Sequence, residues 1–305
     1  MKTKTKLLLL CIAVLLGLWK AEAISSRILR AKAFIRTQYL VWKMHRPETD
    51  ISHLQAFSST GDEWFSKYHF IAHNGGIING RLSSDSREAW EFSYSRGLRI
   101  IDVNLNFTAD NHLVVRHGWD NDLDQAYFPR QPDYQEFKAE KIFMKYTPLD
   151  AEDLVNFMLS HSDLYAAIDS KQKPEKIYSA LVNTARSMKA EEILSRIIVS
   201  LYNMNEVHDI KAIYPFKHFV LRQYFTLHNW YTLADFCLKN DVRVVNVWNT
   251  VIDRDPEGIK ILTSKGIRVY SAVVNSLKQM QAHKDLGITG AVSDYLSESD
   301  WELLK

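Results

Sequence analysis

Two histidines, three residues with acid or amide side chains and one lysine follow the apolar segments of this chain. The set consists of His73, His117, Asp102, Asn104, Asp169 and Lys171. One histidine can take a proton from an attacking hydroxyl while the other gives a proton to the leaving group. Carboxylate and amide oxygens are ligands of hard divalent cations, and a lysine places a fixed positive charge near an anion. Together these residue types suit the cleavage of a phosphodiester.

The spacing of these residues predicts that they share a surface. Side chains alternate along a β-strand, so residues two apart lie on the same face. In the expected strand 99–106, Asp102 and Asn104 share one face and the apolar residues share the other. Asp169 and Lys171 share a face in the same way at the end of a later strand. We therefore expect these polar faces to point into an enclosed site.

The elements that must position these residues follow a repeating order of strand and helix. Strands are expected near residues 70, 100, 166, 197, 219, 243, 269 and 290, with helical segments between them. Short apolar strands separated by helices indicate parallel βαβ units, and eight units in this length predict a (β/α)₈ TIM barrel over residues 67–305. The rival α/β arrangement is a doubly wound sheet, but no GxGxxG motif follows any strand. In a barrel, polar residues at the carboxyl ends of strands mark the active site.

The start of the chain has the pattern of a secretory signal. Lys2, Lys4 and Lys6 precede the uncharged apolar run Leu7–Trp19, and small residues surround position 23. This pattern predicts a signal peptide over residues 1–23 and an exported protein, periplasmic or secreted. The alternative is a signal that is not cleaved, in which case residues 7–19 anchor the protein to a membrane.

A basic segment follows, within a predicted extension and linker over residues 24–66. Residues 24–46 contain six basic residues and no acidic one, interleaved with apolar side chains. As a helix, this segment suits contact with an anionic membrane surface, or it packs across one end of the barrel domain with its cations in solvent. Both interpretations remain open from the sequence.

The charge of the remaining chain excludes one class of partner. Once the ten basic residues and one acidic residue of positions 1–46 are set aside, residues 47–305 contain 28 basic and 35 acidic residues. A nucleic-acid-binding protein needs a basic face for phosphates, so no nucleic-acid partner is expected. Only two cysteines are present, which excludes a disulfide scaffold.

A series of motifs, in order along the chain, resembles the glycerophosphodiester phosphodiesterase superfamily, and most of all its bacterial phosphatidylinositol-specific phospholipase C-like branch. The motifs are Ile71-Ala72-His73-Asn74-Gly75-Gly76, Ser84–Ala89, Ile101-Asp102-Val103-Asn104, Leu113–Trp119, Lys145–Leu149, Ile168-Asp169-Ser170-Lys171, Val274-Asn275 and Val292–Tyr295. The resemblance covers roughly residues 68–296.

The resemblance implies metal-dependent hydrolysis of a phosphodiester next to a free hydroxyl. By this resemblance, His73 and His117 are the general acid and base, and Lys171 is the basic residue of the site. Asp102, Asn104 and Asp169 fall on the positions that hold a divalent cation, Ca²⁺ or Mg²⁺. The substrate is then a glycerophosphodiester, a lipid headgroup or a polymer that contains phosphodiesters.

Several residues depart from the pattern of the family and keep a second hypothesis open. The family has Glu at the position of Asp102, Asp at that of Asn104 and Gln at that of Ser200, and an Asp often stands where this chain has Gly118. These departures favour a barrel that binds a phosphate-bearing glycan or lipid without hydrolysing it. A third hypothesis, scaffolding at a membrane surface, rests on residues 24–46 alone.

Overall fold

The computed structural model describes residues 43–58, 63–119, 130–223 and 228–305. Residues Met1–Pro47 and Glu48–Lys305 form separate units, and the fold described below is that of the second. The predicted signal segment 1–23 and most of the basic segment 24–46 lie outside the described residues. The export, anchor and membrane-contact predictions therefore remain predictions.

Within the described residues, nine strands form one sheet that closes on itself. They are β1 (Phe70–Ala72), β2 (Ile100–Phe107), β3 (Leu113–Val115), β4 (Tyr165–Asp169), β5 (Ile197–Leu201), β6 (His218–Gln223), β7 (Val244–Trp248), β8 (Arg268–Ala272) and β9 (Gly290–Ser293). All neighbours pair in parallel except β3, which runs antiparallel to β2, and the pairing of β1 with both β2 and β9 closes the barrel. The predicted (β/α)₈ barrel is confirmed, with β3 as an addition at its edge.

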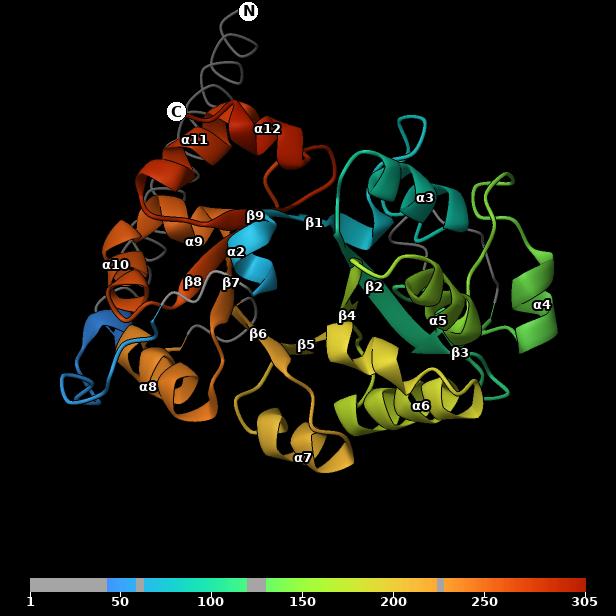
Figure 1. The fold of residues 1–305 in the computed structure, drawn as a ribbon, viewed down its shortest axis with the longest axis horizontal. Helices are drawn as coiled ribbons and strands as arrows, with labels where there is room; N and C mark the ends of the chain where they lie inside the picture. Colours follow the sequence, from blue (N-terminus) through green and yellow to red (C-terminus); the bar gives the residue numbers. More distant parts are fainter. Residues whose placement is uncertain (1–42, 59–62, 120–129, 224–227) are drawn as a thin grey trace, which may run out of the picture. The chain divides into compact units, whose positions relative to one another are not determined.

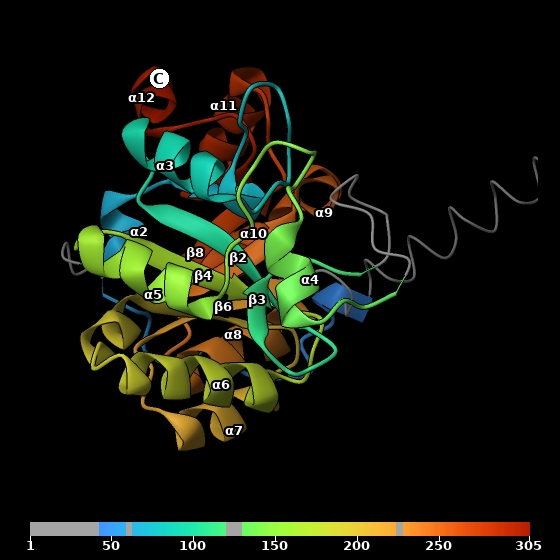
Figure 2. The ribbon, with the colours of Figure 1, turned by 90° about the vertical axis from the view of Figure 1, so that its right-hand side faces the viewer.

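A layer of helices surrounds the strands, as Figure 1 shows. The main helices are α3 (Arg87–Ser95), α5 (Ala151–Ser160), α6 (Pro174–Ser187), α7 (Glu206–Ile213), α8 (Trp230–Asn240), α10 (Pro256–Ser264) and α11 (Leu277–Asp285). Figure 2 shows α3, α5 and α6 side by side on the outside of the barrel. These segments were predicted as helices from the sequence.

Short helices that the sequence pattern did not predict complete the fold. They are α2 (Trp64–Lys67), α4 (Tyr134–Ala139), α9 (Asn249–Arg254) and α12 (Glu298–Glu302). With so few residues, a helix shows too little of its 3.6-residue period to be recognised from apolar spacing. Local capping explains why some of them form: Asp133 and Glu136 make a capping box at the start of α4.

None of the helices in the described ranges is long and apolar enough to cross a membrane.

The half of the barrel interior that is nearest the start of the strands is an apolar core. Its strand residues include Ile71, Ile100, Ala167, Ile198, Val220, Val244, Tyr270 and Val292. Trp64 and Phe65 of α2 join this core from the end at which the strands begin, and Trp64 is only 1% exposed. The predicted start of the barrel at residue 67 falls at the end of this helix. With one end closed by apolar side chains, polar residues on the same inward faces lie toward the carboxyl ends of the strands.

Candidate active site

Polar side chains follow the apolar core residues along the inward faces of the strands. On β2, Asp102 and Asn104 follow Ile100 at intervals of two residues, and on β6 Arg222 follows Val220. Asp169 of β4 is paired in register with Asn104. Because alternate residues share a face, these side chains lie on the inward side above the core. Their place at the carboxyl ends of the strands is where barrel enzymes carry their active sites.

His73 directly follows β1, at the start of the single turn His73–Gly75 (η1). Its Nδ1 atom is 2.8 Å from a carboxylate oxygen of Asp294, which directly follows β9. The other carboxylate oxygen of Asp294 accepts a hydrogen bond of 2.6 Å from the Asn275 amide. Asp294 is therefore held by Asn275 and in turn fixes the orientation of the His73 ring.

The electrostatic surroundings of His73 favour its protonated form. Burial disfavours the charged imidazolium, but the hydrogen bond and charge of Asp294, together with the charge of Asp102, outweigh burial and raise the pKa of His73 above its ordinary value. The hydrogen bond and charge of His73, together with the hydrogen bond from Asn275, outweigh burial and lower the pKa of Asp294. An imidazole held in this way can accept a proton at its other nitrogen and share the resulting charge with Asp294.

The backbone at His73 depends on glycine. Gly76 has a φ of 84°, and a Cβ added there would clash with the Oγ of Ser93. Ser93 itself donates a hydrogen bond of 2.7 Å to the carbonyl of Gly75. The two glycines of the motif therefore allow α3 to approach the turn that presents His73.

Asp102 forms an ion pair with Arg222 across the interior of the barrel. The guanidinium Nη2 atom lies 2.6 Å from a carboxylate oxygen of Asp102, and the two side chains are 4% and 1% exposed. The Nε atom of the same guanidinium donates a hydrogen bond of 2.9 Å to the hydroxyl of Ser200 on β5. The Arg222 side chain therefore extends from β6 past β5 and β4 to β2. Arg222 was not among the predicted site residues.

Asp169 is also paired with a cation. The Nζ atom of Lys171 is 3.3 Å from one carboxylate oxygen, and the hydroxyl of Tyr202 donates a hydrogen bond to the same oxygen. Burial raises the pKa of Asp169, but the charges of Arg222 and Lys171 and these hydrogen bonds outweigh burial and hold it below its usual range. Lys171 is 44% exposed, so its ammonium group is accessible at the mouth of the barrel.

Asn104 is engaged in a buried network of amide and carboxyl groups. Its amide nitrogen donates hydrogen bonds of 2.7 Å to Asn74 and 2.8 Å to Asp85. Burial raises the pKa of Asp85 to about 8, although the hydrogen bond from Asn104 acts in the opposite direction. Asp85 and Asn74 were not predicted as site residues, and they link the turn after β1 to β2.

His117 follows β3. Because β3 pairs antiparallel with β2, the chain at His117 runs back along β2 toward the barrel. Leu105 is the register partner of Val115, and the backbone N–H of Arg116 donates a hydrogen bond of 2.7 Å to the carbonyl of Asn104. The backbone just before His117 therefore lies beside the residues of β2 that face the site. The six residues predicted from the sequence occupy this one end of the barrel.

The predicted divalent cation can be compared with the donors that the structure places here. The carboxylate of Asp102 is bound to a guanidinium, that of Asp169 to an ammonium group, and the nitrogen of the neutral Asn104 amide to two acceptors. Across the described residues, no three His, Cys, Asp or Glu side chains are grouped so that they could hold a metal ion. As placed, these side chains do not fit a divalent cation.

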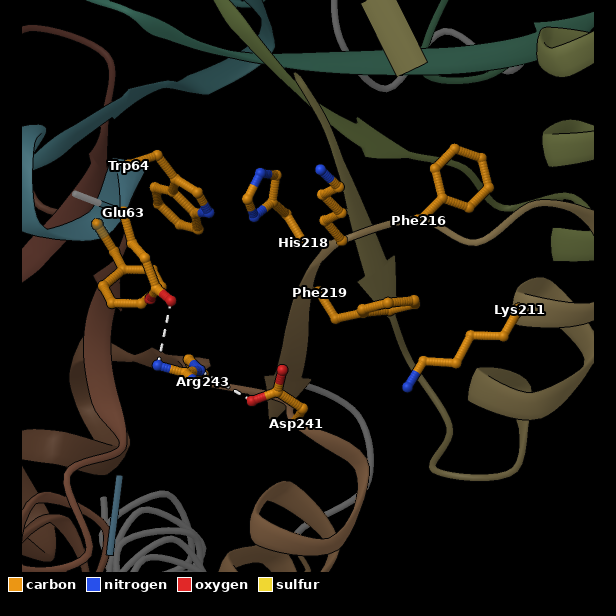
Figure 3. Close-up of a pocket in the computed structure, with 10 residues that line it drawn as sticks. Glu63, Trp64, Lys211, Phe216, His218, Phe219, Asp241 and Arg243 are labelled. Atoms are coloured by element: carbon orange, nitrogen blue, oxygen red, sulfur yellow. Dashed lines mark hydrogen bonds and ion pairs between the residues drawn. The ribbon is translucent and has the colours of Figure 1, made fainter. Parts of the chain in front are cut away.

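A cavity of 360 Å³ lies at the opposite end of the barrel, where the strands begin. Figure 3 shows His218, the first residue of β6, beside Trp64 of α2 in this cavity. Arg243 bridges Glu63 at 3.1 Å and Asp241 at 2.8 Å there. The charged residues of this cavity are thus separated from Asp102 and Arg222 by the apolar core.

Comparison with solved structures finds the same fold in glycerophosphodiester phosphodiesterases. One from Parabacteroides distasonis is 18% identical, with a TM-score of 0.61 over 77% of this chain and 96% of that one. A second, from Thermotoga maritima, is 16% identical, with a TM-score of 0.56 over 77% and 97%. A phosphodiesterase from Oleispira antarctica, solved in complex with the product sn-glycerol-3-phosphate, is 13% identical, with a TM-score of 0.60 over 76% and 95%.

No family model matches the sequence, and no curated protein matches it. The fold is the (β/α)₈ barrel that is also found in solved glycerophosphodiester phosphodiesterases, the family that the sequence motifs resemble. The structures do not single out the phospholipase C-like branch.

Proposed function

We propose that this protein cleaves a phosphodiester that lies next to a free hydroxyl, at the carboxyl end of the barrel. The observation that carries the proposal is the hydrogen-bonded pair of His73 and Asp294, placed at the same barrel end as His117 and Lys171. The fold shared with phosphodiesterases, one of them solved with a phosphate monoester product, supports it. The substrate is a glycerophosphodiester or a related lipid or glycan headgroup.

In this mechanism His73 is the general base. Its Nδ1 atom faces Asp294, so its Nε2 atom takes the proton of the attacking hydroxyl while the oxygen of that hydroxyl bonds to phosphorus. Asp294 stabilises the imidazolium that forms, because it is an anion held in place by Asn275. The bond from phosphorus to the leaving oxygen breaks, and His117 gives a proton to that oxygen.

The ammonium group of Lys171 at the mouth of the barrel then stabilises the phosphate. Lys171 is paired with Asp169 but partly exposed, so its ammonium group can also donate a hydrogen bond to a phosphate oxygen as charge develops there. The predicted divalent cation has no step in this mechanism, since its predicted ligands are already paired.

The test is turnover by the purified protein on glycerophosphodiesters and on bis-para-nitrophenyl phosphate, with products identified by ³¹P NMR. We expect a cyclic phosphodiester as the product of this step, and a phosphate monoester once a water molecule has attacked phosphorus and opened the ring. If no phosphodiester is turned over while the protein is folded, the proposal fails.

A second candidate is a barrel that binds a phosphate-bearing glycan or lipid without cleaving it. The neutral amide of Asn104 and the pairing of Asp102 with Arg222 favour it, because both remove negative charge from the positions that the resemblance assigns to metal ligands. Saturable binding of glycerol 3-phosphate with no turnover of any diester would support this candidate over hydrolysis.

A further inference from the structure

A guanidinium lies among the side chains that the sequence predicted to hold a cation. Arg222 contacts Asp102 at 2.6 Å and Ser200 at 2.9 Å, and its side chain is only 4% exposed. A guanidinium stays protonated at any pH at which the protein folds. The positive charge at this place is therefore permanent and part of the chain itself.

At the position predicted for the cation, the charges of the two carboxylates balance without any added ion. Asp102 and Asp169 supply two negative charges, and Arg222 and Lys171 supply two positive charges. Asn104 contributes none, and its amide nitrogen is already hydrogen bonded. A divalent cation in this neutral cluster would have to separate a buried ion pair and would then lie close to the displaced guanidinium. Both effects oppose binding.

The ion pair also has a consequence for an anionic ligand. Two unpaired carboxylates at the mouth of the barrel would repel a phosphodiester, whereas carboxylates paired with Arg222 and Lys171 would not. Buried ion pairs are a weak source of stability, because the cost of removing the charges from water offsets their attraction. Stability alone therefore does not account for this arrangement.

We propose that Arg222 takes the place of a divalent cation in this barrel, so that the protein neither binds Ca²⁺ or Mg²⁺ at Asp102 and Asp169 nor needs them. The role of Arg222 toward substrate rests on the proposed function, but the exclusion of the cation does not. Arg222 acts through Asp102 and the charge of the site, and is thus a positioning residue.

The test measures cation binding directly, with CaCl₂ and MgCl₂ as the probes. Isothermal titration and thermal unfolding of the wild-type full chain should show no saturable binding up to about 1 mM, the weak end of protein Ca²⁺ affinities. The informative variant combines Arg222→Gln with Asn104→Asp, which removes the guanidinium and leaves three carboxylates. We expect this variant to bind Ca²⁺ at least ~10-fold more tightly than wild type and to unfold at a higher temperature with Ca²⁺ than without.

Arg243→Gln is the matched control, since it removes an arginine paired with acids at the other end of the barrel. It should gain no response to Ca²⁺. Saturable binding by the wild type that Asp102→Asn or Asp169→Asn removes would overturn the proposal, and so would a folded double variant that gains no affinity. If the double variant does not fold in the absence of cation, we expect it to refold in CaCl₂. If it does not refold, the titration of the wild type with CaCl₂ and MgCl₂ alone decides whether the proposal stands.

A turnover assay with and without EDTA separates this inference from the proposed function. Turnover that EDTA leaves unchanged supports both, and turnover that EDTA abolishes overturns the role of Arg222 while hydrolysis stands. Absence of turnover together with absence of cation binding contradicts hydrolysis alone.

Discussion

Arg222 on β6 and Asp102 on β2 are 120 positions apart in the chain, and their side chains form an ion pair of 2.6 Å inside the barrel. The pair joins strands that are not neighbours in the sheet, because β4 and β5 lie between them. It therefore links two sides of the barrel mouth directly. The stability of this end of the barrel and the charge available to a ligand both depend on the pair.

Removal of one partner should cost more than removal of both. Arg222→Gln leaves the carboxylate of Asp102 buried and uncompensated, and we expect it to lower the free energy of unfolding by about 3–5 kcal/mol. Arg222→Gln combined with Asp102→Asn removes both charges and should cost clearly less. Urea-induced unfolding at neutral pH measures the difference.

Arg243→Gln is again the control, because Arg243 and its partner Glu63 are each about a quarter exposed. A more exposed pair contributes about 0–1 kcal/mol, so this variant should be close to wild type. Equal losses in the single and double variants at Arg222 and Asp102 would contradict the structure of the pair.

His117 should be as important to turnover as His73, since each serves one half of the same proton transfer. Alanine at His117 should reduce kcat by about 10²–10⁴-fold, the usual contribution of a positioned proton-transfer group. The double variant with His73→Ala should be little slower than the slower single variant, because residues that act as a unit are not additive. Steady-state kinetics on one diester measure all three variants.

His53→Ala is the control for the loss of a histidine, because the side chain of His53 is 64% exposed and lies outside the strands that carry the site. It should leave turnover unchanged. Turnover by His117→Ala at the wild-type rate would remove His117 from the mechanism and leave the general acid unassigned.

The hydrogen bond between Asp294 and His73 should affect how kcat/KM depends on pH. Asp294 raises the pKa of His73, and a general base works only when it is unprotonated. Activity should therefore fall as pH decreases through a value above the ordinary histidine pKa of about 6.5. In Asp294→Asn the pKa of His73 should fall, and the acidic limb of kcat/KM should move to lower pH while the maximum rate decreases.

Asp253→Asn is a suitable control, because Asp253 contacts His283 on the helical layer and not the barrel interior. Its pH profile should match that of wild type. An acidic limb that stays in place in Asp294→Asn would mean that another group than His73 titrates there.

The barrel and the strand residues of the candidate site could be predicted from the sequence for a clear physical reason. Parallel strands bring their carboxyl ends together, so alternating polar residues such as Asp102, Asn104 and Asp169 could be placed at one mouth without knowing the fold in detail. His73 and His117 were found in the same way, from their positions just after extended segments.

The partners of these residues were harder to predict. An ion pair between Asp102 and Arg222 depends on side-chain reach across the barrel, which sequence spacing does not encode. A signal for Arg222 was nevertheless present, because it shares the inward face of its strand with the core residue Val220. A charged residue at such a position requires a partner inside the barrel. Asp85, in a loop before α3, had no strand pattern to mark it as part of the site.

Processing of the N-terminus is a separate prediction from the sequence. If residues 1–23 are a signal peptide, the exported protein begins at Ile24. N-terminal sequencing of protein recovered from the periplasm or medium should return Ile24 as the first residue. Recovery of Met1 in the membrane fraction would instead indicate an anchor formed by residues 7–19.

The most direct test of the central claim is the turnover of a glycerophosphodiester by wild type and by His73→Ala, with both proteins shown to be folded by circular dichroism. The account predicts that the wild type releases a cyclic phosphodiester or the phosphate monoester formed from it, and that His73→Ala is slower by about 10²–10⁴-fold. Equal turnover by the two proteins, or none by the folded wild type, would contradict it.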